Sequence, residues 1–189
     1  TLGADPEYFV VDKSSGQTRD AGDFTQGTKD NPEELGDGFS IQKDNVMLEM
    51  GCTPCVAPDE FAGVVIDMVS RAEQITSEKR AIISRDSVGY LTKSQSQDPE
   101  LQEFGCLPSE SVYALSADSL AGTSLRVAGG HIHVGHQDGL DQELLVQMLD
   151  LTVELALRKS SPDHYRQRLK YNNITRCEYY AVGGYRTKP

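Results

Sequence analysis

The stretch FSIQKDNVMLEM at residues 39–50 predicts a β-hairpin. Its outer parts, residues 39–42 and 46–50, are rich in side chains that favour strands, and the polar residues 43–45 between them supply a turn. A connection this short joins strands only when they run antiparallel. The hairpin therefore favours an antiparallel sheet as the basis of the fold.

Two further segments have strand character, and both lie far from the hairpin in sequence. Residues 7–12 are rich in β-formers and end at a polar turn, and residues 123–134 have the same character. Residues 17–38 are polar and glycine-rich, so we expect a long loop near the site that the first strand builds. Residues 86–123 are irregular, with a short helix starting at residues 98–99.

Two longer segments carry apolar residues at helical spacing. The first starts at residues 58–60 and runs to about residue 82, and the second is capped by Asp141 and ends at residues 160–162. A short basic helix is expected from Asp163 to about residue 170. These elements predict a single α+β domain over residues 1–189, with a mainly antiparallel sheet and helices packed on one face.

The chain is acidic, with a formal net charge of −11 and a pI near 4.7 over 189 residues. This charge argues against direct, non-specific binding to nucleic acid, which requires a basic surface. It does not exclude a phosphate ligand held through metal ions, because the metal supplies the positive charge. No apolar run approaches the roughly 18 residues of a membrane helix and no signal peptide is apparent, so we expect a cytoplasmic protein.

The cysteines are too few and too scattered for a disulfide framework; they are Cys52, Cys55, Cys106 and Cys177. The spacing of Cys52 and Cys55 is that of a redox or zinc motif, and a helical segment follows it. No second pair completes a zinc site, however, and no βαβ pattern surrounds the motif. We therefore favour a strand-end turn with reduced thiols, in keeping with a reducing compartment.

Three of the four histidines lie in one glycine-flanked stretch, AGGHIHVGH at residues 128–136. His131 and His133 are two residues apart, so in a strand both imidazoles point to the same side. Two neutral imidazoles there can share one cation; the alternative is a half-buried strand whose histidines only form hydrogen bonds. His136 is an odd number of residues from both, which places it on the opposite face or beyond the strand.

Acidic residues within the other predicted strands are candidates to complete a metal site. Asp5 and Glu7 are two residues apart and share a face, and Glu49 is a charge within an otherwise apolar strand, where an unpaired carboxylate is costly. Carboxylates with an imidazole suit Mg²⁺ or Mn²⁺. Alternatively, Glu7 is an edge charge and Glu49 faces solvent. The histidine pair also suggests a zinc hydrolase, although the spacings of the metallo-β-lactamases and the barrel amidohydrolases fit poorly.

Four motifs occur in order along the chain: GADPE at residues 3–7, DNVMLE at 44–49, RVAGGHIHVG at 126–135 and GYRTKP at 184–189. Together they resemble the phage-type carboxylate–amine (COOH–NH2) ligases, which are related to glutamate–cysteine ligase and glutamine synthetase. The resemblance implies a glutamine synthetase-like funnel of antiparallel strands that binds ATP and Mg²⁺ or Mn²⁺. It also implies that a substrate carboxylate is phosphorylated and that an amine then displaces the phosphate to form an amide.

The resemblance also assigns roles to residues. It implies that Glu7, Glu49 and His131 bind metal, with Asp5 and His133 as partners of that site. Arg186 and Lys188 match basic residues near the phosphates, so the resemblance implies that they are catalytic together with Arg126. It also implies that Arg186, Lys188 and His133 bind the cofactor. The assignment agrees with the chemistry, since metal ions and cations neutralise the charge that develops during phosphoryl transfer. In the family a further strand with a glutamate and an arginine follows, so we expect the sequence ending at Pro189 to lack its last strand or strands.

The sequence thus predicts an ATP- and Mg²⁺-dependent carboxylate–amine ligase that acts through an acyl phosphate. Its expected partners are small-molecule or peptide carboxylates and amines, with no nucleic acid and no membrane, and an oligomer remains open. Two alternatives stay open as well. One is a non-catalytic, phage-derived binding or virion-associated domain that retains the fold, and the other is a zinc-dependent hydrolase that uses the His-x-His pair.

Overall fold

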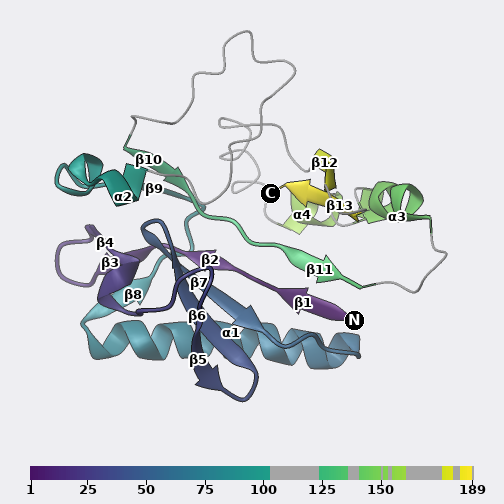
Figure 1. The fold of residues 1–189 in the computed structure, drawn as a ribbon, viewed down its shortest axis with the longest axis horizontal. Helices are drawn as coiled ribbons and strands as arrows, with labels where there is room; N and C mark the ends of the chain where they lie inside the picture. Colours follow the sequence, from purple (N-terminus) through teal and green to yellow (C-terminus); the bar gives the residue numbers. More distant parts are fainter. Residues whose placement is uncertain are drawn as a thin grey trace, which may run out of the picture. The chain divides into compact units, whose positions relative to one another are not determined.

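The protein is described by a computed structural model (Figure 1). The residues it describes are 1–102, 124–135, 141–149, 151–152, 155–160, 176–180 and 184–188. The chain divides into two compact units, Thr1–Pro108 with Asp118–Val134 and Ser109–Ala117 with Gly135–Pro189. All strand pairs among the described residues are antiparallel, and helices are few. The predicted α+β class with mainly antiparallel sheet is therefore confirmed, while a single domain over residues 1–189 stays a prediction.

The first unit contains most of the described strands. They are β1 (Leu2–Ala4), β2 (Glu7–Tyr8), β3 (Val10–Asp12), β4 (Thr18–Arg19), β5 (Glu33–Gly36), β6 (Phe39–Asp44), β7 (Met47–Cys52), β8 (Ala81–Ile83), β9 (Val88–Tyr90), β10 (Leu125–Val127) and β11 (Ile132–Val134). Its helical segments are η1 (Ala21–Asp23), α1 (Pro58–Glu78), η2 (Gln95–Gln97) and α2 (Pro99–Gln102). The segment predicted as loop, residues 17–38, therefore contains two short strands and a helical turn.

The predicted hairpin is formed by β6 and β7, but its turn is shorter than expected. Asp44 pairs with Met47, so only Asn45 and Val46 lie between the strands. Asn45 has a φ of 55°, a left-handed conformation that asparagine tolerates better than most residues. Asp44, which the sequence placed in the turn, therefore ends a strand and shares a face with Gln42.

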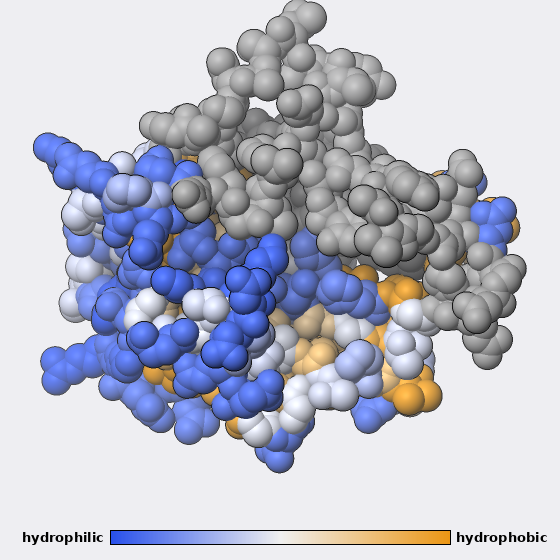
Figure 2. Space-filling model, in the orientation of Figure 1, coloured by the Kyte–Doolittle hydropathy of each residue, from blue (hydrophilic) through white to orange (hydrophobic). Residues whose placement is uncertain are grey.

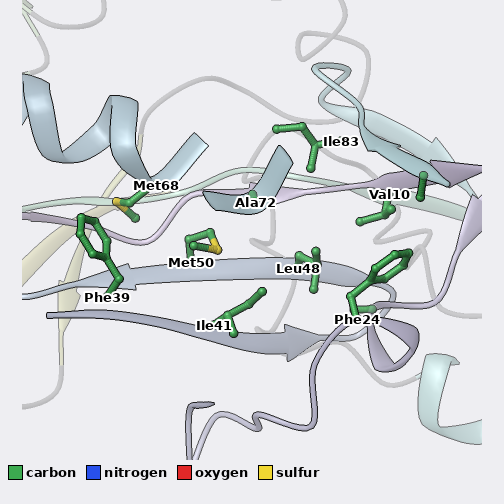
Figure 3. Close-up of a cluster of buried hydrophobic side chains, with 11 residues drawn as sticks. Val10, Phe24, Phe39, Ile41, Leu48, Met50, Met68, Ala72 and Ile83 are labelled. Atoms are coloured by element: carbon green, nitrogen blue, oxygen red, sulfur yellow. The ribbon is translucent and has the colours of Figure 1, made fainter. Parts of the chain in front are cut away.

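One face of this sheet packs against α1. The strand order is β2-β7-β6-β5, and Ile41, Leu48 and Met50 are buried on the side where α1 contributes Met68 and Ala72 (Figure 3). The spacing of Met68 and Ala72 is the helical repeat on which the sequence prediction rested. This cluster is the main hydrophobic core, and it fixes which face of the sheet is left for polar side chains.

Helix α1 ends at Glu78, earlier than the predicted residue 82. Arg80 has a φ of 58° and its backbone N–H donates to the Ser77 carbonyl, which turns the chain out of the helix. The next residues form β8, which pairs with β3. The apolar residues after the turn therefore continue the helical pattern in sequence but belong to a sheet.

The segment predicted as one strand over residues 123–134 is two strands. β10 pairs with β9, whereas β11 pairs with β1. The break falls at Gly130, which has a φ of 153° and passes so close to Pro6 that an added Cβ would lie 2.8 Å from the Pro6 Cα. Only glycine fits that approach without a shift of the backbone, and this close crossing places His131 beside Asp5, just after the end of β1.

The described residues of the second unit are α3 (Gln142–Leu149), α4 (Leu155–Ser160), β12 (Arg176–Tyr180) and β13 (Gly184–Lys188). Asp141 caps α3 as predicted, because its Oδ1 accepts a hydrogen bond from the Leu144 N–H at 3.1 Å. Strands β12 and β13 form an antiparallel pair. The helix predicted from Asp163 lies outside the described residues.

Hydrophilic residues cover much of the described surface on the side shown in Figure 2. This agrees with the formal net charge of −11. Within the described residues, none of the helices combines the length and the apolar composition that crossing a bilayer requires.

Candidate metal centre

Three carboxylates gather on the face of the sheet opposite α1. Glu7, Asp44 and Glu49 each offer an oxygen, and these atoms lie within 4.8 Å of one another. The register explains their convergence: Glu7 on β2 is directly opposite Glu49 on β7, which is opposite Gln42 on β6, and Asp44 lies two residues beyond Gln42. Three adjacent strands therefore bring their polar side chains to one point. We refer to these three residues as the acid triad.

The acid triad is electrostatically crowded. Burial raises the pKa of Glu7 to about 7, the Gly129 N–H at 2.8 Å opposes the rise, and the charges of Asp44 and Glu49 add to it. Burial likewise raises the pKa of both Asp44 and Glu49. A hydrogen bond with the Glu7 side chain opposes the rise in the pKa of Asp44. Like charges held this close are costly without a cation to offset them.

Two side chains near the acid triad compensate part of this charge. The Lys29 ammonium lowers the pKa values of both Asp44 and Glu49, and Gln42 lowers that of Glu49 through a hydrogen bond. Lys29 lies in the segment that the sequence analysis expected to be a loop near the site, although no individual residue of that loop was singled out. Lys29 therefore offsets part of the negative charge of the acid triad.

The two histidines of the third motif meet on Asp5. Asp5 Oδ1 accepts the His131 backbone N–H at 2.5 Å and lies 3.1 Å from His131 Nδ1, while Oδ2 lies 3.0 Å from His133 Nε2. Burial alone would raise the pKa of Asp5, but the hydrogen bonds from His131 and His133 outweigh it and the pKa is lowered. Asp5 is therefore an ionised carboxylate that orients both imidazoles.

The structure brings some of the predicted site residues together and separates others. Glu7 and Glu49 are neighbours, and Asp44, which the sequence analysis did not select, joins them. Among the residues that the structure describes, Asp5, His131 and His133 are not members of a group whose ligand atoms all lie within 4.8 Å. Alternation along β6 would have indicated Asp44, had the predicted turn begun at Asn45 instead of Lys43.

The His131 imidazole nevertheless lies near enough to the acid triad to affect it. Its charge lowers the pKa values of Glu7 and Asp44. With Nδ1 facing Asp5, the ring has the arrangement in which a carboxylate fixes the tautomer and orientation of a histidine beside a metal site. The described geometry supports His131 as a neighbour of the metal centre, oriented by Asp5.

Arg126 is buried and forms hydrogen bonds with main-chain carbonyl groups. Its side chain is 2% exposed, and its guanidinium donates to the main-chain carbonyls of Leu125 and Leu101, each at 2.7 Å. The Leu101 carbonyl also accepts from Asn45 Nδ2 at 2.9 Å, so Arg126 is tied to the hairpin turn beside Asp44. A guanidinium buried on main-chain carbonyls holds the backbone in place, and the catalytic role expected for Arg126 stays a prediction.

The remaining predicted residues belong to the second unit or lie outside the described residues. Arg186 and Lys188 lie two residues apart on β13, hence on one face, and the structure describes only the backbone of that strand. They belong to the second unit. His136 and Cys106 lie outside the described residues.

The chain matches no protein-family model, no curated protein and no solved structure. The resemblance to carboxylate–amine ligases therefore rests on the four sequence motifs alone. The acid triad fits a metal by its own chemistry, since an all-carboxylate donor set is what Mg²⁺ and Mn²⁺ prefer. It does not fit zinc as well, because structural and catalytic zinc sites draw mainly on histidine and cysteine.

Proposed function

We propose that this chain is an ATP- and Mg²⁺-dependent carboxylate–amine ligase with a glutamine synthetase-like funnel. The observation that carries the proposal is the acid triad, which gathers three oxygen ligands on the polar face of an antiparallel sheet. Four family-like motifs in order along the chain supply the choice of reaction. Mn²⁺ is an alternative metal, and the substrates are a small-molecule or peptide carboxylate and an amine in the cytoplasm.

The residues of the site have distinct tasks under this proposal. Bound Mg²⁺ and ATP would supply the phosphoryl group and neutralise its charge. Glu7, Asp44 and Glu49 hold the metal, and Asp5 keeps the His131 imidazole oriented beside them. Arg186 and Lys188 are proposed to bind the phosphates as implied by the fourth motif.

Divalent-cation binding is the first test. We expect Mn²⁺, followed by electron paramagnetic resonance or calorimetry, to bind the full chain, and Glu49→Gln to weaken binding about tenfold, because one charged oxygen ligand is lost. Glu34→Gln is the matched control, since Glu34 is an exposed acid on the neighbouring strand β5. Equal affinities for the two variants would contradict a metal site at the acid triad.

Activity is the second test. With Mg²⁺ and a mixture of carboxylates and amines, we expect amine-dependent release of phosphate from ATP and its loss in Glu49→Gln. Metal binding without any nucleotide binding would favour the non-catalytic domain that retains the fold. Stoichiometric zinc in the purified protein, with hydrolysis in place of ligation, would favour the hydrolase alternative.

A further inference from the structure

The pair Cys52 and Cys55 is the one sequence motif that the proposed function does not use. Cys52 is the last residue of β7, and Cys55 lies three residues later, in the connection that leads to α1 at Pro58. Both are free thiols, Cys52 half-buried and Cys55 4% exposed. The predicted turn at the end of a strand is thus confirmed, while the reduced state of its thiols stays a prediction. The question is what the turn can do.

The backbone of this turn is held at both ends. Thr53 N–H donates to the Gly38 carbonyl at 2.7 Å, and Cys55 exchanges two backbone hydrogen bonds with Leu2, at 2.7 and 2.8 Å. The Cys52 thiol is 3.7 Å from the Ala4 carbonyl. Two cysteines fixed on one short, anchored turn are kept near each other, which lowers the entropy lost when they bond.

Both thiols line the same open pocket. Its volume is about 140 Å³, and its wall includes Thr53, Pro54 and Glu60 as well as the two cysteines. The Glu60 carboxylate accepts the Val56 N–H at 3.2 Å as part of the cap of α1, so its charge is fixed at the pocket. An open pocket with an anionic wall admits a small molecule and favours one that carries positive charge.

We infer that Cys52 and Cys55 form a reversible intramolecular disulfide by exchange with a small cationic disulfide that enters this pocket. The Cys52 thiolate attacks one sulfur of the reagent and displaces the first small thiolate, which takes up a proton. The Cys55 thiol then loses its proton, attacks the Cys52 sulfur and releases the second small thiol. The two protein thiols are oxidised to one disulfide, and the small disulfide is reduced to two thiols.

The order of attack follows from the surroundings of the two sulfurs. Burial, and then the negative charge of Glu60, raise the pKa of Cys55, so this residue stays a thiol until the mixed disulfide is next to it. Cys52 is the more exposed of the two. The disulfide would form three residues from Glu49 and next to β1. It would therefore add a covalent constraint near the acid triad without involving the three carboxylates.

Peptide mapping after treatment with cystamine, a disulfide with two ammonium groups, tests the inference. The full chain carrying Cys106→Ser and Cys177→Ser should lose two hydrogen atoms in mass, with the new bond located between residues 52 and 55. Cys55→Ser should instead accumulate a stable mixed disulfide on Cys52. Persistent mixed disulfides in the chain that retains both cysteines, or no reaction in the folded protein, would overturn the inference.

A rate comparison tests the role of the pocket. Cystamine should react about tenfold faster than the dianionic reagent dithiodiglycolate, because the pocket wall is negatively charged. Glu60→Gln, which retains an oxygen acceptor for the cap, should reduce this ratio, whereas Asp59→Asn in the same helical turn should leave it unchanged. Equal rates for the two reagents with the unsubstituted pocket would contradict selection for a cation.

Discussion

On one face of the β2-β7-β6-β5 sheet, Ile41, Leu48 and Met50 pack against α1, whereas on the other face Glu7, Asp44 and Glu49 converge. The same strands build both faces, because successive side chains point to opposite sides. On the first face, removal of apolar area from water stabilises the folded state. On the second face, the crowded carboxylates repel one another and destabilise the folded state. The packing of the first face therefore holds together a site that would not form by itself.

The largest effect on stability is expected for Leu48→Ala. Leu48 is fully buried between the sheet and α1, and truncation of such a residue costs about 2–5 kcal/mol through lost burial and the cavity left behind. We expect a drop of that size in the free energy of unfolding, measured with urea. Glu34→Gln, on the exposed edge strand, should change stability by less than about 0.5 kcal/mol. A loss below about 1 kcal/mol for Leu48→Ala would show that this face is not the core.

The next test is Gly130→Ala, which acts at the crossing between β11 and the start of β2. The new methyl group would lie 2.8 Å from the Pro6 Cα, in a backbone conformation that L-residues rarely adopt. We expect a loss of about 1–3 kcal/mol in stability and weaker Mn²⁺ binding, since Asp5 and Glu7 flank Pro6. Gly63→Ala in α1 is the control; no atom lies within 4 Å of its added Cβ, and we expect about 0.4–1 kcal/mol of stabilisation. Equal effects at the two glycines would contradict the close approach.

The last expected effect is a pH dependence that originates on the acid face. The pKa of Glu7 is raised to about 7 from an ordinary value of 4.5, so the folded state binds more protons than the unfolded state between these values. Without metal, stability should therefore fall by about 2–3 kcal/mol at most as the pH rises from 4.5 to 7, and by less where solvent screens the carboxylate. Glu7→Gln should flatten this slope, and excess Mg²⁺ should oppose it by favouring the ionised form. A stability that rises with pH over this range would be the opposite of this prediction.

Much of the fold followed from local patterns. The alternation of apolar residues located β6 and β7, and the helical spacing of Met68 and Ala72 located α1. The ends of these elements could not be predicted from the patterns, because they depend on single residues with a left-handed backbone conformation. Asn45 shortened the hairpin turn and Arg80 ended the helix, and neither residue is a glycine that would have marked the position.

The site was predictable in part, from strand composition and from the four motifs, which had selected Glu7 as well as Glu49. Glu49 stood out as a charge in an apolar strand, and the structure places it in the acid triad. The pairing of Asp5 with His131 and His133 is a tertiary contact across more than a hundred residues, and sequence spacing carries no information about it. Asp44 was missed because the predicted turn began two residues too early and therefore excluded Asp44 from the strand.

Arg126 joins three parts of the first unit through one carbonyl group. Its guanidinium donates to the carbonyl of Leu101 in α2, and the same carbonyl accepts a hydrogen bond from Asn45 in the turn between β6 and β7. The Ser124 carbonyl, just before β10, accepts the Leu91 N–H at 2.7 Å. The conformation of the turn that positions Asp44 therefore depends on a side chain from a distant part of the sequence.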